Sequence, residues 1–173
     1  VVSRVAEFFF RAPKLLTSRD VVSEFDCGSE ELNRYLEHYA LQSQNSEAAR
    51  SYVSHLGEQI AGYYSLAYGS VECEQAPNRV SKGMARHPIP VMVLARLAVD
   101  KAYARQGLGE ELLRDALLRT LSAADIAGLR AVVVDAKNDR AKGFYGRYGF
   151  ESFPENRFRL ALILKDVKAL LKG

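Results

Sequence analysis

The chain has 173 residues, of which 48% are hydrophobic and 26% are charged, and its net charge is +3. This composition is ordinary for a packed globular protein of one domain, and it excludes a disordered or fibrous chain. No apolar run approaches the ~20 residues that cross a bilayer, and the two cysteines are too few for a disulfide scaffold or a cysteine zinc site. We therefore expect a cytoplasmic protein with one domain over residues 1–173 and no metal. Because the chain begins with Val, residues 1–11 are interpreted as a disordered or artificial start.

The first half of the chain predicts a helix, a β-hairpin and a long loop. Ser29 is placed to cap a helix whose apolar side chains share one face, namely Leu32, Tyr35, Leu36 and Tyr39. Residues 52–56 alternate as a strand does, a Gly-Glu turn follows, and residues 60–67 read as the returning strand. Residues 69–90 contain three prolines and two glycines without periodicity, which predicts a long loop.

Charge is distributed unevenly around this loop. Residues 75–99 contain no acid but five basic side chains, which are Arg79, Lys82, Arg86, His87 and Arg96. A stripe of this kind attracts phosphate, although a solvated surface loop has the same composition. Composition alone favours the solvated surface loop, because such runs are common on protein surfaces.

The second half of the chain alternates strands and helices. Residues 91–99 are apolar almost throughout, which predicts a strand buried on both faces. The elements expected after it are a helix (108–122), a buried strand (131–134), a short helix (140–148), a strand (158–164) and a helical turn (167–171). This alternation, opened by a hairpin, predicts an α/β fold with a mixed sheet and helices on both of its faces.

A turn with two glycines joins the strand at 91–99 to the helix after it. The N–H groups at a helix start favour a bound anion, and glycines let the backbone approach that anion closely. The turn lacks the Lys-Ser/Thr pair of a P-loop, and its glycine spacing is not that of a Rossmann motif. By itself, the pattern favours a purely structural turn.

This turn resembles the acetyl-CoA pyrophosphate loop of the GNAT superfamily, whose pattern is Gln/Arg-x-x-Gly-x-Gly/Ala. Gly107 and Gly109 match its fourth and sixth positions, whereas Ala104 departs from the usual Gln or Arg at the first. The neighbouring Arg105 is the side chain that would supply the missing charge. The resemblance implies cofactor contacts along the turn, at Arg105, Gln106, Gly107, Leu108, Gly109 and Glu110.

Residues 138–150 resemble the second GNAT motif, N-x-x-A-x-x-F-Y-x-x-x-G-F, at every fixed position. Two motifs in the right order, each after a buried strand, are far more specific than either alone. The resemblance extends over about residues 12–165 and implies the GNAT fold. In that fold, helices flank a central mixed sheet whose strands splay apart at the CoA site, and acetyl-CoA is the acetyl donor.

The resemblance also assigns roles to individual residues. Tyr145 is implied as the general acid that protonates the departing CoA sulfur, although a lone Tyr is more often a core aromatic. Asn138 is implied as a hydrogen-bond partner of the pantetheine arm, and Phe144 as packing under the cofactor. The backbone N–H groups around Leu97, Ala98 and Val99 are implied to stabilise the thioester oxygen as negative charge develops on it.

No general base emerges from the sequence. Arg96 occupies the middle of the strand where a carboxylate would be suggestive, and Asp100, Glu110 and Glu111 are interpreted as turn and first-turn residues. A lysine amine, with a pKa of ~10.4, is almost fully protonated at neutral pH, whereas an α-amine near ~7.7 is partly neutral. The missing base therefore favours an α-amine as the acceptor.

Several segments resemble one branch of the superfamily, the GNAT toxins of bacterial toxin–antitoxin pairs. They are Phe25-Asp26-Cys27-Gly28, Gly62-Tyr63-Tyr64-Ser65-Leu66, Arg96-Leu97-Ala98-Val99-Asp100 and Val134-Asp135-Ala136. The branch implies acetylation of aminoacyl-tRNA, a ribbon-helix-helix antitoxin as partner, and a homodimer. In that case Arg79, Lys82, Arg86 and Arg96 are expected to contact the tRNA.

Two other functions remain open at this point. One is a housekeeping or metabolic N-acetyltransferase that acts on a small amine or on a protein N-terminus. The other is a non-catalytic CoA-binding module, against which the intact Tyr145 argues.

Overall fold

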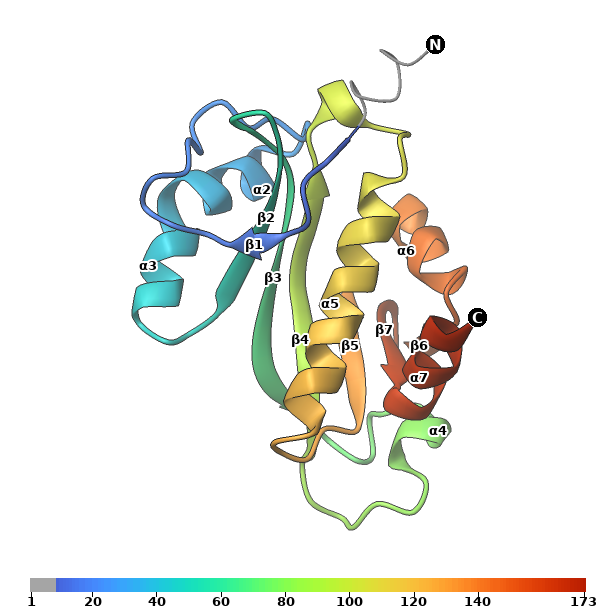
Figure 1. Cartoon of the computed structure of the whole chain (residues 1–173). Helices are drawn as coiled ribbons and strands as arrows, with labels where there is room; N and C mark the ends of the chain where they lie inside the picture. Colours follow the sequence, from blue (N-terminus) through green and yellow to red (C-terminus); the bar gives the residue numbers. More distant parts are fainter. Residues whose placement is uncertain (1–8) are drawn as a thin grey trace. The chain divides into compact units, whose positions relative to one another are not determined.

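The computed structural model describes residues 9–173, in which a seven-stranded mixed sheet is flanked by helices (Figure 1). The strand order is β1-β2-β3-β4-β5-β7-β6. Strands β4 and β5 run parallel, whereas β1 with β2, β2 with β3, β5 with β7 and β6 with β7 are antiparallel. The predicted mixed α/β sheet is therefore confirmed. The interpretation of residues 1–11 falls mostly outside the described residues.

The described chain forms two compact units. The first contains the chain up to Leu66 together with Arg96–Asp115, and the second contains Ala67–Ala95 and Ala116–Gly173. Three elements, β3, β4 and α5, contribute residues to both units. The single domain expected over residues 1–173 stays a prediction.

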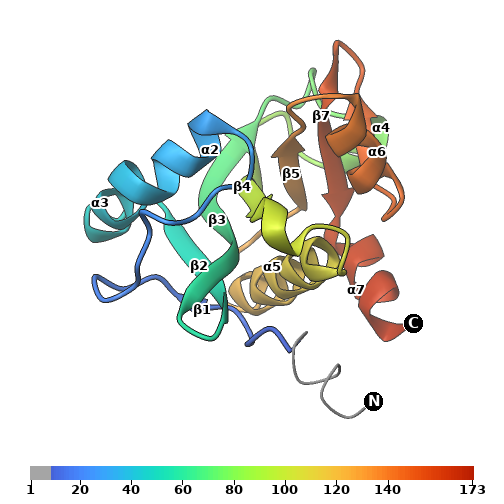
Figure 2. The same cartoon turned by 90° about the horizontal axis from the view of Figure 1, so that it is seen from above.

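A helical segment packs on one face of a hairpin in the first unit (Figures 1 and 2). As predicted, Ser29 caps this segment, because its hydroxyl accepts a hydrogen bond from the Leu32 N–H at 3.4 Å. The helix is longer than predicted and contains a π-helical turn. Tyr35 and Leu36 are buried in the core as expected, but the prediction is wrong for Tyr39, which is 45% exposed. The elements are β1 (Lys14–Leu15), α2 (Glu30–Arg34), η1 (Tyr35–Tyr39), α3 (Ala40–Asn45), β2 (Arg50–Leu56) and β3 (Gln59–Val71).

The two faces of β3 pack against different parts of the first unit. Tyr63 is fully buried in the core cluster that also contains Tyr35 and Leu36. Successive strand residues point to opposite faces, so Gly62 faces the other way. A Cβ at Gly62 would lie 2.8 Å from Leu112 Cδ1 and 3.1 Å from the Ala98 carbonyl oxygen. This position in the Gly-Tyr-Tyr-Ser-Leu segment therefore requires glycine for close packing.

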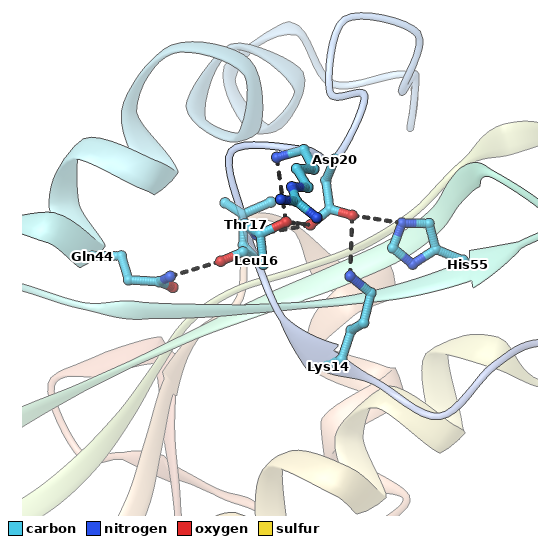
Figure 3. Close-up of polar contacts among 7 residues, drawn as sticks. Lys14, Leu16, Thr17, Asp20, Gln44 and His55 are labelled. Carbon is cyan, nitrogen blue, oxygen red and sulfur yellow. Dashed lines mark hydrogen bonds and ion pairs between the residues drawn. The ribbon is translucent and has the colours of Figure 1, made fainter.

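A polar cluster around the buried Asp20 and His55 side chains attaches the segment before α2 to strand β2 (Figure 3). Asp20 Oδ1 lies 3.0 Å from His55 Nε2 and 3.2 Å from Lys14 Nζ, and Asp20 Oδ2 accepts the Thr17 N–H at 2.8 Å. The Gln44 amide donates to the Leu16 carbonyl at 2.8 Å. Within the described residues, the buried His55 Nδ1 has no hydrogen-bond partner. The cluster therefore holds the chain between β1 and α2 against the hairpin, although β1 itself pairs with β2 over only two residues.

The second unit contains the parallel pair and the C-terminal antiparallel strands. The predicted loop over residues 69–90 is partly wrong, since β3 continues to Val71 and a helical turn follows Pro77. The C-terminal helix is nine residues long, longer than the predicted turn. The elements are α4 (Asn78–Ser81), β4 (Ile89–Val99), α5 (Leu108–Ala124), β5 (Ala131–Asp135), α6 (Asp139–Gly146), β6 (Glu151–Phe153), β7 (Asn156–Ile163) and α7 (Leu164–Lys172).

No helix between residues 9 and 173 is both long and apolar enough to cross a membrane.

Candidate active site

Strand β4 differs in strand pairing and in burial between its first and second halves. Val91–Leu94 pairs with Ala131–Val134 of β5, and β4 then continues beyond this register to Val99. Ala95 is exposed, Arg96, Leu97 and Val99 are half-buried, and Ala98 is buried. The prediction of a strand buried on both faces is therefore wrong for its second half. Solvent reaches the residues around Leu97, where the thioester contacts are expected.

The backbone of the turn after β4 is arranged so that a ligand could approach it closely. Arg105 and Gly107 both have left-handed backbone angles, with φ of +62° and +82°. A Cβ on Gly107 would meet nothing within 4 Å, so this glycine serves backbone conformation and access, and not internal packing. Arg105, Gln106 and Gly107 are exposed, whereas Leu108 is buried and anchors the start of α5.

The first turn of α5 supplies free backbone donors beside these glycines. The Glu111 N–H bonds back to the Gly107 carbonyl at 3.2 Å, so the N–H groups of residues 108–110 precede the helical hydrogen-bond ladder. The positive end of the helix dipole lies at the same place. This geometry suits an anionic group such as a pyrophosphate.

Asn138 also has a structural role, which the motif alone does not predict. Its side-chain oxygen accepts the Ala141 N–H at 2.9 Å and so caps α6. The cap fixes the start of the helix that carries Phe144 and Tyr145. Only the amide nitrogen of Asn138 is left for the predicted contact with a pantetheine arm.

Tyr145 is a buried phenol on α6. Its side chain is 6% exposed and lies edge-on to Phe144 and Phe150, at centroid distances of 5.1 and 5.5 Å. Burial raises the pKa of the Tyr145 hydroxyl above its ordinary value, and that hydroxyl has no hydrogen-bond partner among residues 9–173. Phe144 is half-buried and also contacts Tyr148. The Tyr145 phenol therefore stays protonated at neutral pH, which is the form that a general acid needs.

The basic side chains do not form one uniform group. The Arg79 guanidinium pairs with Asp166 of α7, with Nη2 3.1 Å from Oδ1. Arg96 lies in the first unit, where its guanidinium carbon is 3.4 Å from the centroid of the Tyr35 ring. Lys82 and Arg86 are exposed in the α4–β4 connection. These two therefore remain the simplest candidates for contacts with a phosphate backbone.

Arg130, just before β5, supports this loop, and the sequence did not reveal that structural role. It donates to the carbonyls of Val80, Arg79 and Lys82 at 2.9, 3.0 and 3.1 Å. These bonds satisfy the end of the short α4 turn and fix the backbone next to Lys82. The contacts join residues about fifty positions apart, so no local motif signals them.

Asp100 is a turn residue, as expected. Its Oδ1 accepts the Ala102 N–H at 2.9 Å and caps the 3-10 turn η2 (Lys101–Tyr103). Its Oδ2 accepts the Asp26 N–H at 3.0 Å, so both oxygens are occupied and neither is placed as a base. No cluster of metal-ligating side chains occurs in the part of the chain from residue 9 onward.

The comparison with protein families decides the assignment. Residues 18–163 match the model described as an acetyltransferase (GNAT) domain. The chain belongs to the GNAT acetyltransferase family. Both motif segments of this GNAT acetyltransferase, the turn after β4 and residues 138–150, lie within the matched range.

Relatives of this GNAT acetyltransferase include bacterial toxins. The chain is 40% identical over 162 residues to the tRNA-acetylating toxin of Mycobacterium tuberculosis (strain ATCC 25618 / H37Rv), covering 94% of this chain and 97% of the relative. The structure of AtaT complexed with acetyl-methionyl-tRNAfMet superposes with a TM-score of 0.86 at 28% identity, covering 94% and 99% of the two chains. A tyrosine-to-phenylalanine mutant of AtaT, bound to the C-terminus of the antitoxin AtaR and acetyl-CoA, gives 0.81 at 27% identity, covering 95% and 99%.

Proposed function

We propose that this protein is a toxin that transfers the acetyl group of acetyl-CoA to the α-amine of the amino acid on charged tRNA. The observation that carries the proposal is the 40% identity, over nearly the full length of both chains, to a tRNA-acetylating toxin. The tRNA complex of the related AtaT supports the same acceptor. Acetylation removes the nucleophilic amine that peptide-bond formation needs, so the expected consequence is arrest of translation.

The chemistry assigned to the site is direct acyl transfer. The neutral amine nitrogen attacks the thioester carbonyl carbon, forming an N–C bond while negative charge develops on the carbonyl oxygen. Backbone N–H groups around Leu97 and Val99 are assigned to that oxygen. The C–S bond then breaks, the thiolate takes the Tyr145 proton, and the proton lost by the amine passes to solvent. Restoring the Tyr145 proton from solvent completes the cycle.

The cofactor contacts are assigned to both motif segments. The turn from Arg105 to Glu110 takes the pyrophosphate, because its exposed glycines and free N–H groups suit an anion. The Asn138 amide nitrogen and the half-buried Phe144 take the pantetheine arm. Lys82 and Arg86 are assigned to the tRNA, together with Arg96, whose guanidinium stacks on the Tyr35 ring. Arg79 contributes only if its ion pair with Asp166 opens.

The partners follow from the same proposal. A toxin of this kind acts in the cytoplasm, where tRNA is charged, and is neutralised by an antitoxin. We assign a ribbon-helix-helix antitoxin and a homodimeric toxin. Size-exclusion chromatography with light scattering on the purified chain tests the homodimer, and co-purification with a co-expressed ribbon-helix-helix antitoxin tests the partner.

A parallel acceptor assay tests the proposed function. Radiolabelled acetyl-CoA is supplied with charged tRNA, small amines and a peptide with a free N-terminus. Label that becomes attached to charged tRNA and is released with the aminoacyl group supports the toxin. Label on a small amine or peptide alone identifies a metabolic or N-terminal acetyltransferase, and CoA binding without transfer to any acceptor identifies a binding module.

Charge reversal at Lys82 and Arg86 tests the tRNA surface. The double variant Lys82→Glu, Arg86→Glu is expected to raise the KM for charged tRNA about tenfold and to flatten its salt dependence, because phosphate contacts release counterions. Acetyl-CoA affinity stays unchanged. The matched control is Lys168→Glu, Lys172→Glu on α7, which changes the same number of exposed charges outside the α4–β4 connection. Equal salt-dependent kinetics in both double variants would exclude the loop from tRNA binding.

A further inference from the structure

The residues before α2 are bonded to the start of the turn after β4, although they lie 74 positions away in the chain. The Asp26 N–H donates to Asp100 Oδ2 at 3.0 Å, and the Lys101 N–H donates to the Asp26 carbonyl at 2.9 Å. The Lys101 ammonium also lies 2.8 Å from Asp26 Oδ2. One backbone-to-side-chain hydrogen bond, one backbone–backbone hydrogen bond and one ion pair therefore join the same short segments, and we call these three contacts the Asp26–Asp100 brace.

The Asp26 side of the brace is itself fixed. Its Oδ1 accepts the Gly28 N–H and the Asn33 amide, both at 2.9 Å. The Asn33 oxygen in turn accepts the Cys27 N–H at 2.8 Å. Hydrogen bonds from Lys101, Asn33 and the Gly28 backbone hold the pKa of the Asp26 carboxyl far below its ordinary value. The Asp26 carboxylate therefore remains ionised at neutral pH, which keeps its ion pair with Lys101.

The Asp100 side of the brace is the junction between two cofactor-binding stretches. Before it lies the end of β4, residues 97–99, and after it lie η2 and the turn at 105–109. The Asp100 N–H donates to the Ala61 carbonyl at 2.8 Å, and Asp100 Oδ1 caps η2. The backbone, Oδ1 and Oδ2 of Asp100 thus each hold a different segment.

We infer that Asp26 and Asp100 are positioning residues, which hold the pyrophosphate turn at a fixed place relative to the end of β4 so that acetyl-CoA meets a preformed site. Preformed contacts raise affinity because binding does not have to order the loop. Arg105 and Gly107 are both left-handed, so the turn needs such external support to keep one conformation. The inference rests on the proposed cofactor site in the turn.

Substitutions at Asp100 can separate the brace from the local cap. Asn and Ser are both good cap residues and keep a bond to the Ala102 N–H. Asn places an N–H group opposite the Asp26 N–H, and Ser is too short to reach it, so both variants lose the bond of the brace that the Asp100 side chain makes. We expect Asp100→Asn and Asp100→Ser to raise the Kd for acetyl-CoA about tenfold by calorimetry. Turnover at saturating acetyl-CoA should stay within about threefold of wild type.

A purely structural role would give a different pattern. If Asp100 only stabilises the fold, these variants lower the thermal midpoint and the active fraction, and the folded remainder binds acetyl-CoA normally. Ser29→Ala is the matched control, because it removes the cap of α2 without touching residues 100–102. It should lower the thermal midpoint and leave the Kd unchanged. A control that weakens binding as much as Asp100→Asn would overturn the inference.

Failure of the brace and failure of the cofactor site are distinguishable. If Gly107→Val abolishes acetyl-CoA binding while Asp100→Asn and Asp100→Ser bind it normally, the turn is the site and the brace does not position it. If all three variants bind acetyl-CoA as wild type does, the site has been assigned to the wrong turn.

Discussion

Replacing Tyr145 with Phe should leave acetyl-CoA bound and lower turnover by about 100- to 10,000-fold, the range typical of general acid catalysis. The phenol is buried, protonated and without a partner among the described residues, so only its hydroxyl is removed while the aromatic contacts to Phe144 and Phe150 remain. Single-turnover kinetics with charged tRNA measure the loss at the chemical step.

The control for this prediction is Tyr148→Phe, which removes a hydroxyl from a neighbouring tyrosine that also contacts Phe144. It should retain turnover within a few-fold of wild type. If Tyr145→Phe turns over as fast as the control in a folded protein with normal acetyl-CoA affinity, another group protonates the sulfur.

Gly107→Val should weaken acetyl-CoA binding by at least about 100-fold without unfolding the protein. The left-handed backbone of Gly107 costs a side-chain-bearing residue about 1–2 kcal/mol. The branched side chain would also stand in the open space where the pyrophosphate approaches the backbone. Calorimetry measures the affinity, and circular dichroism checks that the fold remains.

Gly83→Val separates backbone strain from the loss of access. Gly83 has a similar φ of +77°, and a Cβ there also meets nothing within 4 Å, but it lies outside the proposed cofactor site. It should lower stability as much as Gly107→Val does and bind acetyl-CoA normally. Similar acetyl-CoA affinities in the two variants would mean that the phosphates bind elsewhere.

The local elements were predictable because they depend on neighbouring residues. The Ser29 cap, the apolar strand at 131–134 and the left-handed Gly149 after α6 all follow from side-chain patterns a few residues long. Strands β1 and β6 have only two and three residues, too few to show periodicity. The π-helical turn also escaped prediction, because its sequence continues the ordinary pattern of a helix.

The site was only partly predictable for a related reason. The two motifs locate Gly107 and Tyr145, because each role depends on a short contiguous sequence. Arg79 was grouped with other basic residues, since nothing local indicates its pairing with Asp166, 87 positions away. Asp26 and Asp100 each read as an ordinary turn residue, and only the folded chain brings them together. Only long-range contacts show that Arg79 is held in an ion pair whereas Lys82 and Arg86 are exposed to solvent.

The two short strands at the margins of the sheet have a consequence for assembly. Unpaired N–H and C=O groups along an edge strand can recruit an extended segment of another chain, and a long, flat edge is the best template. Here the outermost strands are β1, with two residues, and β6, whose pairing shifts register within its three residues. Neither edge offers a continuous ladder, so the protein should resist edge-to-edge aggregation.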